Sequence, residues 1–308
     1  MVPFGRFGKI ILLFISLRLM VSVCGWDVSG FRTLMVCMVA GKMMGDWDRR
    51  YRSGGLVRQI SPNFTKALAN YFGTGPTDVE ASIEAHNKYV EALEENGLEV
   101  IILPGLENHP DCCFVEDAAV IIGGAAVICN LGHPSRRGEA ESIAEALSQH
   151  LETIVMPENA KLDGGDVVFY DDYFLIGRST RTNDEGVEFI ENICHDRGFK
   201  TFVFDIPQST LHLSTICSSP APGVLVTAEG HLLPEQFDGI DAEIIWVPNE
   251  ESYAANTIGF ENGCVIISDG YPKTAELLSQ YGFSVTCVDM EHIRCADGSL
   301  TCLRLFFK

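Results

Sequence analysis

The chain has 308 residues, of which 46% are apolar and 21% are charged, a composition typical of a folded globular protein. Its formal net charge is −20, and its 22 Lys and Arg residues are scattered along the chain instead of forming runs. This pattern argues against a surface that follows phosphates, so neither nucleic acid nor an anionic membrane is expected as a partner. The electrostatic field of so negative a chain favours a small cationic substrate.

The eleven cysteines are spread along the chain with no regular spacing and no CxxC pair. This usage predicts reduced thiols in a cytoplasmic protein and argues against a disulfide scaffold or a zinc site. Most of these cysteines are therefore expected to be small core residues.

Residues 1–53 differ from the rest and are interpreted as a leader. An apolar run over residues 10–24 follows two basic residues, but Arg18 interrupts it, so it is too short to span a bilayer comfortably. A signal peptide is one interpretation. The preferred one is a dispensable or misassigned segment, with translation starting at Met43 or Met44.

Residues 54–308 are predicted to form one domain in which a pattern recurs: strand, turn, strand, helix, and a strand that ends near a proline. The clearest copy has its turn at Gly123-Gly124 and a helix with its apolar residues on one face. Its expected elements are the strands Phe114–Ile122, Ala125–Asn130 and Thr153–Met156 and a helix over 138–150.

Three further copies follow in chain order. Their expected elements are Val167–Tyr170, Tyr173–Ile176, a helix over 183–193 and Phe202–Ile206; then Gly223–Ala228 and Glu243–Val247; then Thr257–Phe260, Gly263–Ser268, a helix over 273–280 and Ser284–Val288.

The two ends of the domain supply a fifth unit. The leading part offers a strand at Gly55–Ile60, a helix over 78–96 and a strand at Glu99–Leu103, and the tail Leu300–Phe307 is a strand without a helix. A ββαβ unit cannot bury its own sheet face, so neighbouring units must stack. The predicted fold is α/β, a five-bladed ββαβ propeller with pseudo-fivefold symmetry around a central channel. An ordinary α/β sandwich is the alternative.

Side chains capable of chemistry gather at the beginnings of the units, which a ring turns toward its channel. These are Asp111, Glu116 and Asp117 in the first copy, Asp163 and Asp166 in the next, His212 in the third, and Asp297 and Cys302 in the tail. Because each recurs at an equivalent position of its unit, the set is more credible as a functional cluster than any single residue.

The motifs PDCCFVEDAAV, PSRR, LDGGDV, RTN, LHL, YAAN and DGSLTC, in this order and at these separations, resemble dimethylarginine dimethylaminohydrolase, of the guanidino-group-modifying (pentein) superfamily. The resemblance runs from roughly residue 55 to the end of the chain. It implies the five-bladed ββαβ propeller. It also implies a dimethylargininase, which hydrolyses Nω-methylated L-arginine to L-citrulline plus dimethylamine or methylamine and needs no cofactor.

The resemblance assigns catalytic roles to three residues. Cys302 is the nucleophile that attacks the guanidinium carbon, and His212 is the general acid and base. Glu116, together with Asp111, holds the guanidinium nitrogens. No metal is implied, although a free thiolate and imidazole are generic zinc ligands, so zinc at Cys302 and His212 is expected to inhibit if it binds.

Substrate binding is assigned by the same resemblance. Asp117 supports the site, Arg136 and Arg181 grip the α-carboxylate, and Asp297 lies beside the substrate amine. A lid is expected near residues 63–75.

The chemistry can also be argued from the residue types. A guanidinium carbon is a poor electrophile because its charge is delocalised, and a thiolate is the soft nucleophile it needs; a cationic substrate lowers the thiol's pKa. Carboxylates bind guanidinium N–H groups in a planar arrangement. One imidazole can protonate the leaving amine and then deprotonate a water.

Each assignment has a structural alternative. Cys302 and His212 are also compatible with a role as buried core residues. The segment from Asp163 to Asp166 is compatible with a simple turn, so Asp163 is placed near the site but outside the catalytic group. The sequence does not choose between Arg136 and Arg137.

Two other functions stay open. One is an arginine deiminase or amidinotransferase, and the other is a non-catalytic propeller that binds arginine analogues. Leu303 stands where better-known mammalian members carry a second cysteine, so redox behaviour of that cysteine does not transfer. A monomer and a homodimer are both compatible with the sequence.

Overall fold

The computed structural model describes residues 47–50 and 52–308. The apolar run over residues 10–24 and the expected starts at Met43 and Met44 lie outside these residues. Within the described part of the chain, no helix is long and apolar enough to cross a membrane.

The described residues upstream of the first strand contact the domain. Trp47–Arg50 form a short 3₁₀ helix. Arg50 is buried, and its guanidinium donates to the carbonyl oxygen and to the hydroxyl of Ser219, both at 2.7 Å. Part of the segment interpreted as a leader is therefore attached to the folded domain.

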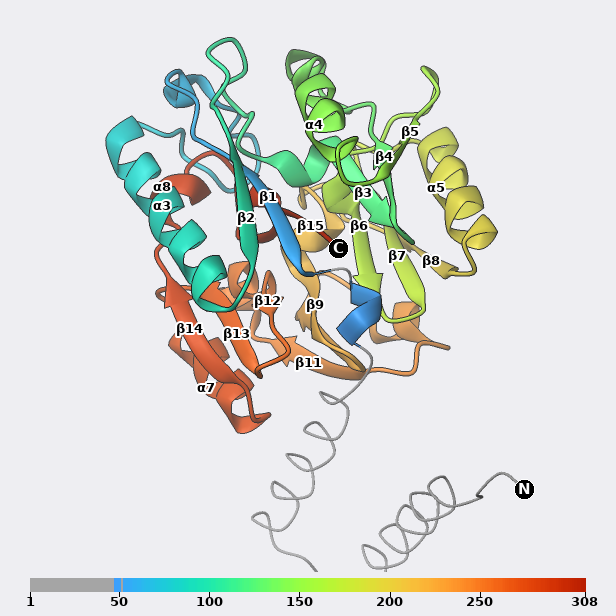
Figure 1. The fold of residues 1–308 in the computed structure, drawn as a ribbon. Coiled ribbons are helices and arrows are strands. Elements are labelled where there is room, and N and C mark those ends of the chain that lie inside the picture. The colour runs from blue at the N-terminus through green and yellow to red at the C-terminus, as the bar shows by residue number, and fades with distance from the viewer. Residues whose placement is uncertain (1–46, 51) are drawn as a thin grey trace, which may run out of the picture.

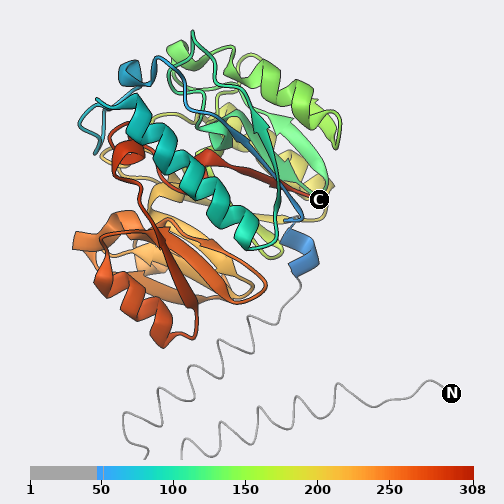
Figure 2. The ribbon, with the colours of Figure 1, turned by 60° about the vertical axis from the view of Figure 1, so that its left-hand side comes forward.

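The strands of the described residues form five three-stranded sheets, and each sheet contains one antiparallel and one parallel strand pairing. The first blade in chain order consists of β1 (Gly54–Arg58), α3 (Val79–Glu95), β2 (Glu99–Leu103) and the terminal strand β15 (Leu305–Phe307). The second consists of β3 (Ala119–Ile122), β4 (Ala125–Ile128), α4 (Glu139–Leu147) and β5 (Glu152–Val155), and the third of β6 (Val167–Tyr170), β7 (Tyr173–Arg178), α5 (Asp184–Asp196) and β8 (Lys200–Asp205). The fourth consists of β9 (Cys217–Ala221), β10 (Val224–Ala228) and β11 (Glu243–Val247), and the fifth of β12 (Ile258–Gly259), β13 (Cys264–Ser268), α7 (Pro272–Gln280) and β14 (Ser284–Val288). Figures 1 and 2 show the long helices at the periphery and the sheets inside them. The predicted five-bladed α/β propeller is confirmed.

Local sequence explains these elements. Gly123 and Gly124 have φ of +53° and +82°, which L side chains rarely adopt, and they join β3 to β4 as the predicted turn. Every residue of the middle strands β4, β10 and β13 is buried, which explains their continuous apolar runs. Helix α5 begins where the Asn183 side chain accepts from the backbone N–H of Gly186 at 2.9 Å.

The ring closes between segments far apart in the sequence. Strand β1 pairs antiparallel with β15, with Gly54 opposite Phe307 and Leu56 opposite Leu305, and it pairs in parallel with β2. Figure 1 shows β15, in dark red, next to β1, in blue. The prediction that the tail joins the leading part of the domain in a fifth unit is confirmed.

Two predicted strands were wrong at their beginnings. The segments expected as Phe114–Ile122 and Leu300–Phe307 start instead as 3₁₀ helices, Val115–Ala118 and Thr301–Leu303, before β3 and β15. A buried run of this length looks the same in sequence whether it is a single helical turn or the start of a strand. The difference matters because both turns carry site residues.

Candidate active site

One cavity collects the predicted site residues. It lies between the beginnings of several blades. The predicted residues that line it are Asp111, Asp117, Arg136, Arg181, His212, Asp297 and Cys302. The remaining predicted residue, Glu116, is buried next to this cavity but is not among its lining residues.

The Cys302 thiol lies on the 3₁₀ turn before β15 and is only 4% exposed. Its Sγ is 3.2 Å from the hydroxyl of Ser299. Burial, together with the negative charges of Glu116 and Asp117, raises the pKa of the thiol to about 12. The thiol is therefore neutral at neutral pH when the cavity holds no cation.

Asn256, the last residue of the YAAN motif, fixes this turn. Its side-chain NH₂ donates to the carbonyl oxygen of Ser214 at 2.7 Å and to the hydroxyl of Thr301 at 2.9 Å. Its side-chain oxygen accepts from the Thr301 backbone N–H at 3.0 Å. This fully buried amide thus ties the segment that carries Cys302 to the one-turn helix α6 (Leu213–Ile216), which follows His212.

His212 is buried between carboxylates. Its Nε2 lies 3.1 Å from an oxygen of Asp163, and its Nδ1 lies 3.6 Å from an oxygen of Asp117. Burial lowers the pKa of the imidazole, but Asp117, Asp163 and Asp166 outweigh it and raise that pKa to about 9. The histidine is therefore an imidazolium at neutral pH, ready to give up a proton.

The Gly-Gly pair of the LDGGDV motif allows this close approach. A Cβ at Gly165 would lie 2.7 Å from Nδ1 of His212 and 2.8 Å from a carboxylate oxygen of Asp117. A Cβ at Gly164 would lie 2.1 Å from the Glu116 carbonyl oxygen. Any larger side chain would push apart the turns that form the cavity.

Asp163 is the functional residue that sequence reasoning left out. It is fully buried, and besides His212 it accepts from the backbone N–H of Gly132 at 2.7 Å and lies 3.3 Å from the Arg181 guanidinium. A carboxylate that holds one imidazole nitrogen fixes the ring's orientation and stabilises its charged form. The available signal was its position at a unit beginning, equivalent to those of the other site residues.

The two predicted arginines are held by carboxylates in different ways. Arg136 is buried and forms ion pairs with Asp117 at 2.5 Å and with Glu139 at 2.8 Å, whereas Arg137 is exposed. Arg181, about one-tenth exposed, has Asp163 as its ion-pair partner. Arg136 therefore faces the cavity with its charge already balanced, and Arg181 retains more freedom to meet a ligand.

Asp297 holds a loop over the cavity. With φ of +59°, it accepts four backbone N–H groups at 2.5–3.1 Å, from residues 70–73. Nearby, the backbone N–H of Leu68, which lines the cavity, donates to Asp111 at 3.0 Å. These two carboxylates anchor the segment in which the lid was expected. The predicted contact of Asp297 with a substrate amine stays a prediction.

Glu116 forms part of the wall behind the cysteine. One oxygen accepts from the hydroxyls of Thr301 at 2.8 Å and Ser214 at 3.2 Å, and the other lies 3.3 Å from the Arg304 guanidinium. Burial raises the pKa of this carboxyl, while Arg304 lowers it. Its predicted contact with a guanidinium substrate stays a prediction.

A cluster of potential metal ligands coincides with the histidine site. Among the described residues, ligand atoms of Asp117, Asp163 and His212 lie within 4.8 Å of one another. The two carboxylates are already engaged by Arg136 and Arg181. Cys302 is not part of this group, and inhibition by zinc at Cys302 and His212 stays a prediction.

Comparisons with known proteins agree with this geometry. The family described as "N,N dimethylarginine dimethylhydrolase, eukaryotic" matches residues 74–303. The N(G),N(G)-dimethylarginine dimethylaminohydrolase of Pseudomonas aeruginosa is 35% identical over 237 residues, 76% of this chain and 91% of that protein. The Streptomyces coelicolor protein of the same name is 29% identical over 249 residues, 80% of this chain and 94% of that protein.

A solved structure extends the similarity to the fold. A mutant of the Pseudomonas aeruginosa enzyme in complex with citrulline superposes with a TM-score of 0.77 at 32% identity, covering 83% of this chain and 100% of that chain. The sequence motifs, the five blades and the cavity are thus accounted for together: the chain belongs to the dimethylarginine dimethylaminohydrolase family of pentein-fold hydrolases.

Proposed function

We propose that the protein hydrolyses Nω-methylated L-arginine, asymmetric dimethylarginine or monomethylarginine, to L-citrulline plus dimethylamine or methylamine. The observation that supports this most is a buried thiol, Cys302, in one cavity with the imidazolium of His212 and with the carboxylates of Asp111 and Asp117. A relative that binds citrulline adds support.

Substrate binding prepares the nucleophile. The guanidinium, a permanent cation, enters a cavity whose carboxylates can accept its N–H groups, and Arg181, which lines the same cavity, binds the α-carboxylate. Burial and the negative charges of Glu116 and Asp117 raise the pKa of the free Cys302 thiol to about 12, and a cation beside the sulfur offsets the effect of those charges. The thiol then releases its proton to solvent, because His212 is already protonated.

Thiolate attack forms the covalent intermediate. A bond forms between Sγ of Cys302 and the guanidinium carbon, giving a tetrahedral adduct. The imidazolium of His212 then transfers its proton to the methylated nitrogen, the C–N bond breaks, and the neutral amine leaves. A planar thiouronium remains on the cysteine.

Hydrolysis restores the enzyme. The imidazole, now neutral, takes a proton from a water as the water oxygen attacks the thiouronium carbon. The C–S bond breaks with its electron pair going to the sulfur of Cys302, and the hydroxyl proton of the adduct passes to that sulfur. The C=O of the citrulline ureido group forms, and the neutral thiol is restored. Asp163 stabilises the imidazolium that this step regenerates.

Product analysis of the purified protein tests the proposal. Citrulline and dimethylamine are expected in equal amounts from asymmetric dimethylarginine, and Cys302→Ser is expected to lose at least about a thousandfold in kcat. Cys287→Ser, at an exposed cysteine, is the matched control. Ammonia from arginine without methylamine release would establish a deiminase instead, and binding without turnover would establish a binding protein.

A further inference from the structure

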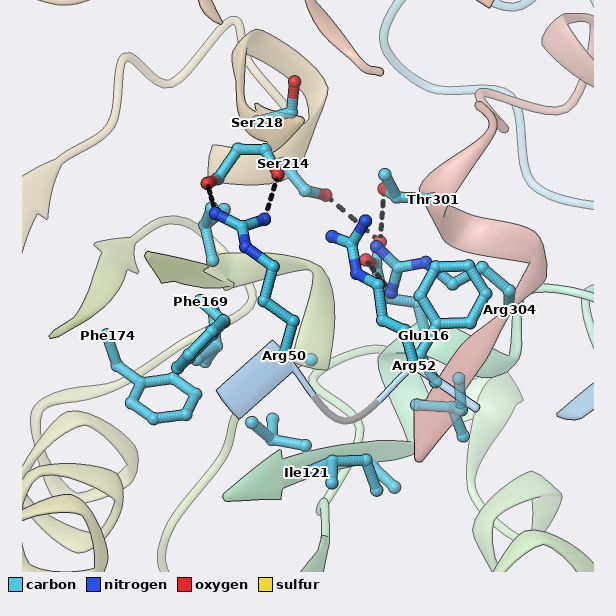
Figure 3. A pocket seen from close by; sticks show the side chains of 18 of the residues that line it. Arg50, Arg52, Glu116, Ile121, Phe169, Phe174, Ser214, Ser218, Thr301 and Arg304 are labelled. Carbon is cyan, nitrogen blue, oxygen red and sulfur yellow. Dashed lines mark hydrogen bonds and ion pairs between the residues drawn. The ribbon is translucent and has the colours of Figure 1, made fainter. Parts of the chain in front are cut away.

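A second cavity lies on the other side of Glu116. It has a volume of about 110 Å³. Its lining includes three arginines, Arg50, Arg52 and Arg304, together with Glu116 (Figure 3). None of these arginines has a role in the reaction proposed above.

The positive charges in this cavity exceed the negative ones. Arg50 pairs with Asp171 at 3.3 Å, and Arg304 pairs with Glu116 at 3.3 Å. Among the described residues, no carboxylate forms an ion pair with Arg52, whose guanidinium donates only to the carbonyl oxygen of Gly259. In a chain with a net charge of −20, this is a local excess of the opposite sign.

The guanidinium groups also repel one another. Those of Arg52 and Arg304 lie over the same ring, that of Phe306, at 5.2 and 4.6 Å from its centre. Burial, followed by the charges of Arg50 and Arg304, lowers the pKa of Arg52 well below its ordinary value. Because arginine stays charged in proteins, a counterion is the simplest way to relieve this repulsion.

Unsatisfied donors lie in the same place. The Nε–H groups of Arg50 and Arg304 are buried and have no hydrogen-bond acceptor among the described residues. Buried guanidinium donors without acceptors are costly and uncommon, so these two point to a missing acceptor. The cavity also presents hydroxyl groups, which can donate to the same acceptor; they belong to Ser214, Ser218, Ser219, Thr257 and Thr301.

We propose that this arginine cavity binds a small oxyanion of the phosphate class, either inorganic phosphate or the phosphate of a monoester. Guanidinium groups match phosphate oxygens in geometry and charge, and hydroxyl donors complete such sites. Binding here does not depend on the reaction proposed for the other cavity.

Titration of the full chain in phosphate-free buffer tests the site. Inorganic phosphate and glycerol 2-phosphate are added separately, with chloride at equal ionic strength as the reference, while Tm and heat of binding are measured. We expect a saturable rise in Tm beyond that in chloride for at least one phosphate. Tighter binding of glycerol 2-phosphate identifies a monoester site, and tighter binding of inorganic phosphate identifies a free-anion site.

Three variants with the same charge change locate the binding. Arg52→Gln is expected to weaken phosphate binding at least about tenfold. Two other variants are expected to leave phosphate binding unchanged: Arg178→Gln, on the surface, and Arg181→Gln, in the catalytic cavity, which is the cavity lined by Cys302 and His212. No saturable response of the wild-type chain to either phosphate overturns the proposal, and so does equal binding by Arg52→Gln and wild type.

Discussion

The two cavities on either side of Glu116 differ in charge although the same short turns build both. Asp117 and Cys302 line the catalytic cavity, whereas their chain neighbours Glu116 and Thr301 line the arginine cavity. A 3₁₀ turn sends successive side chains in different directions, so one segment can supply a carboxylate to each side. The comparison shows that a cavity's charge is decided residue by residue, not by the net charge of the chain.

Removing the carboxylate that holds the histidine is expected to have the largest effect on the catalytic side. In Asp163→Asn, the imidazole loses the charged partner of its Nε2, so kcat is expected to fall about a thousandfold. The alkaline limb of the pH profile should move to lower pH, because Asp163 helps raise the pKa of His212. Steady-state citrulline assays measure both quantities.

Asp205→Asn is the control for this change, because Asp205 is an exposed partner of Arg178. A variant of Asp163 that stays within about threefold of wild-type kcat would show that the carboxylate does not orient the histidine.

The charge of His212 links the catalytic cavity to folding stability. Its pKa is raised from 6.5 to about 9 in the folded chain, so its contribution is fully present below pH 6.5 and is lost as pH rises through 9. A shift of this size corresponds to about 3 kcal/mol. Urea unfolding between pH 6 and 9.5 should show this loss in wild type and a flatter profile in His212→Asn. Parallel profiles for the two proteins would contradict it.

Neutralising Glu116, which lies between the two cavities, tests how much its negative charge affects the Cys302 thiol. The charge of Glu116 adds to burial in raising the pKa of the Cys302 thiol, so Glu116→Gln should lower that pKa. Inactivation of the free enzyme by iodoacetamide should then be about tenfold faster at fixed pH. Glu250→Gln, at an exposed glutamate, should not change that rate. An unchanged rate in Glu116→Gln would place the charge too far from the sulfur to matter.

The smallest effect is expected at the edge of the catalytic cavity. Asp297→Asn retains the shape of the side chain but replaces one acceptor oxygen with a donor, which faces backbone N–H groups of residues 70–73. We expect about 1 kcal/mol of weaker loop anchoring, seen as a roughly fivefold rise in KM with kcat nearly unchanged. A fall in kcat at constant KM would instead place Asp297 in the chemistry.

Much of the fold could be predicted because the repeat imposes strong local patterns. The Gly123-Gly124 turn, the apolar middle strands and the closing pair β1 and β15 follow from glycine conformation, burial on both faces and the need to pair open sheet edges. The 3₁₀ turns at Val115–Ala118 and Thr301–Leu303 were missed, since burial in so short a segment does not reveal its backbone hydrogen bonds.

The residues of the cavity that holds Cys302 and His212 could be predicted, but the hydrogen bonds and ion pairs between them could not. The motifs identify the thiol and the imidazole. The hydrogen bond between Asp163 and His212 and the ion pair between Glu116 and Arg304 are visible only in the structure. The arginine cavity gave no local signal at all. Its arginines come from both ends of the described chain, and two of them, Arg50 and Arg52, lie in the segment interpreted as a leader.

The pairing of β15 with β1 has a consequence for biosynthesis. Strand β15 follows every other described strand in the chain, so it leaves the ribosome after all of them, and the contact it makes is among the most distant in sequence. Cys302 precedes it by only a few residues. A nascent chain therefore cannot hold Cys302 beside His212 until β15 has been synthesised and has paired with β1.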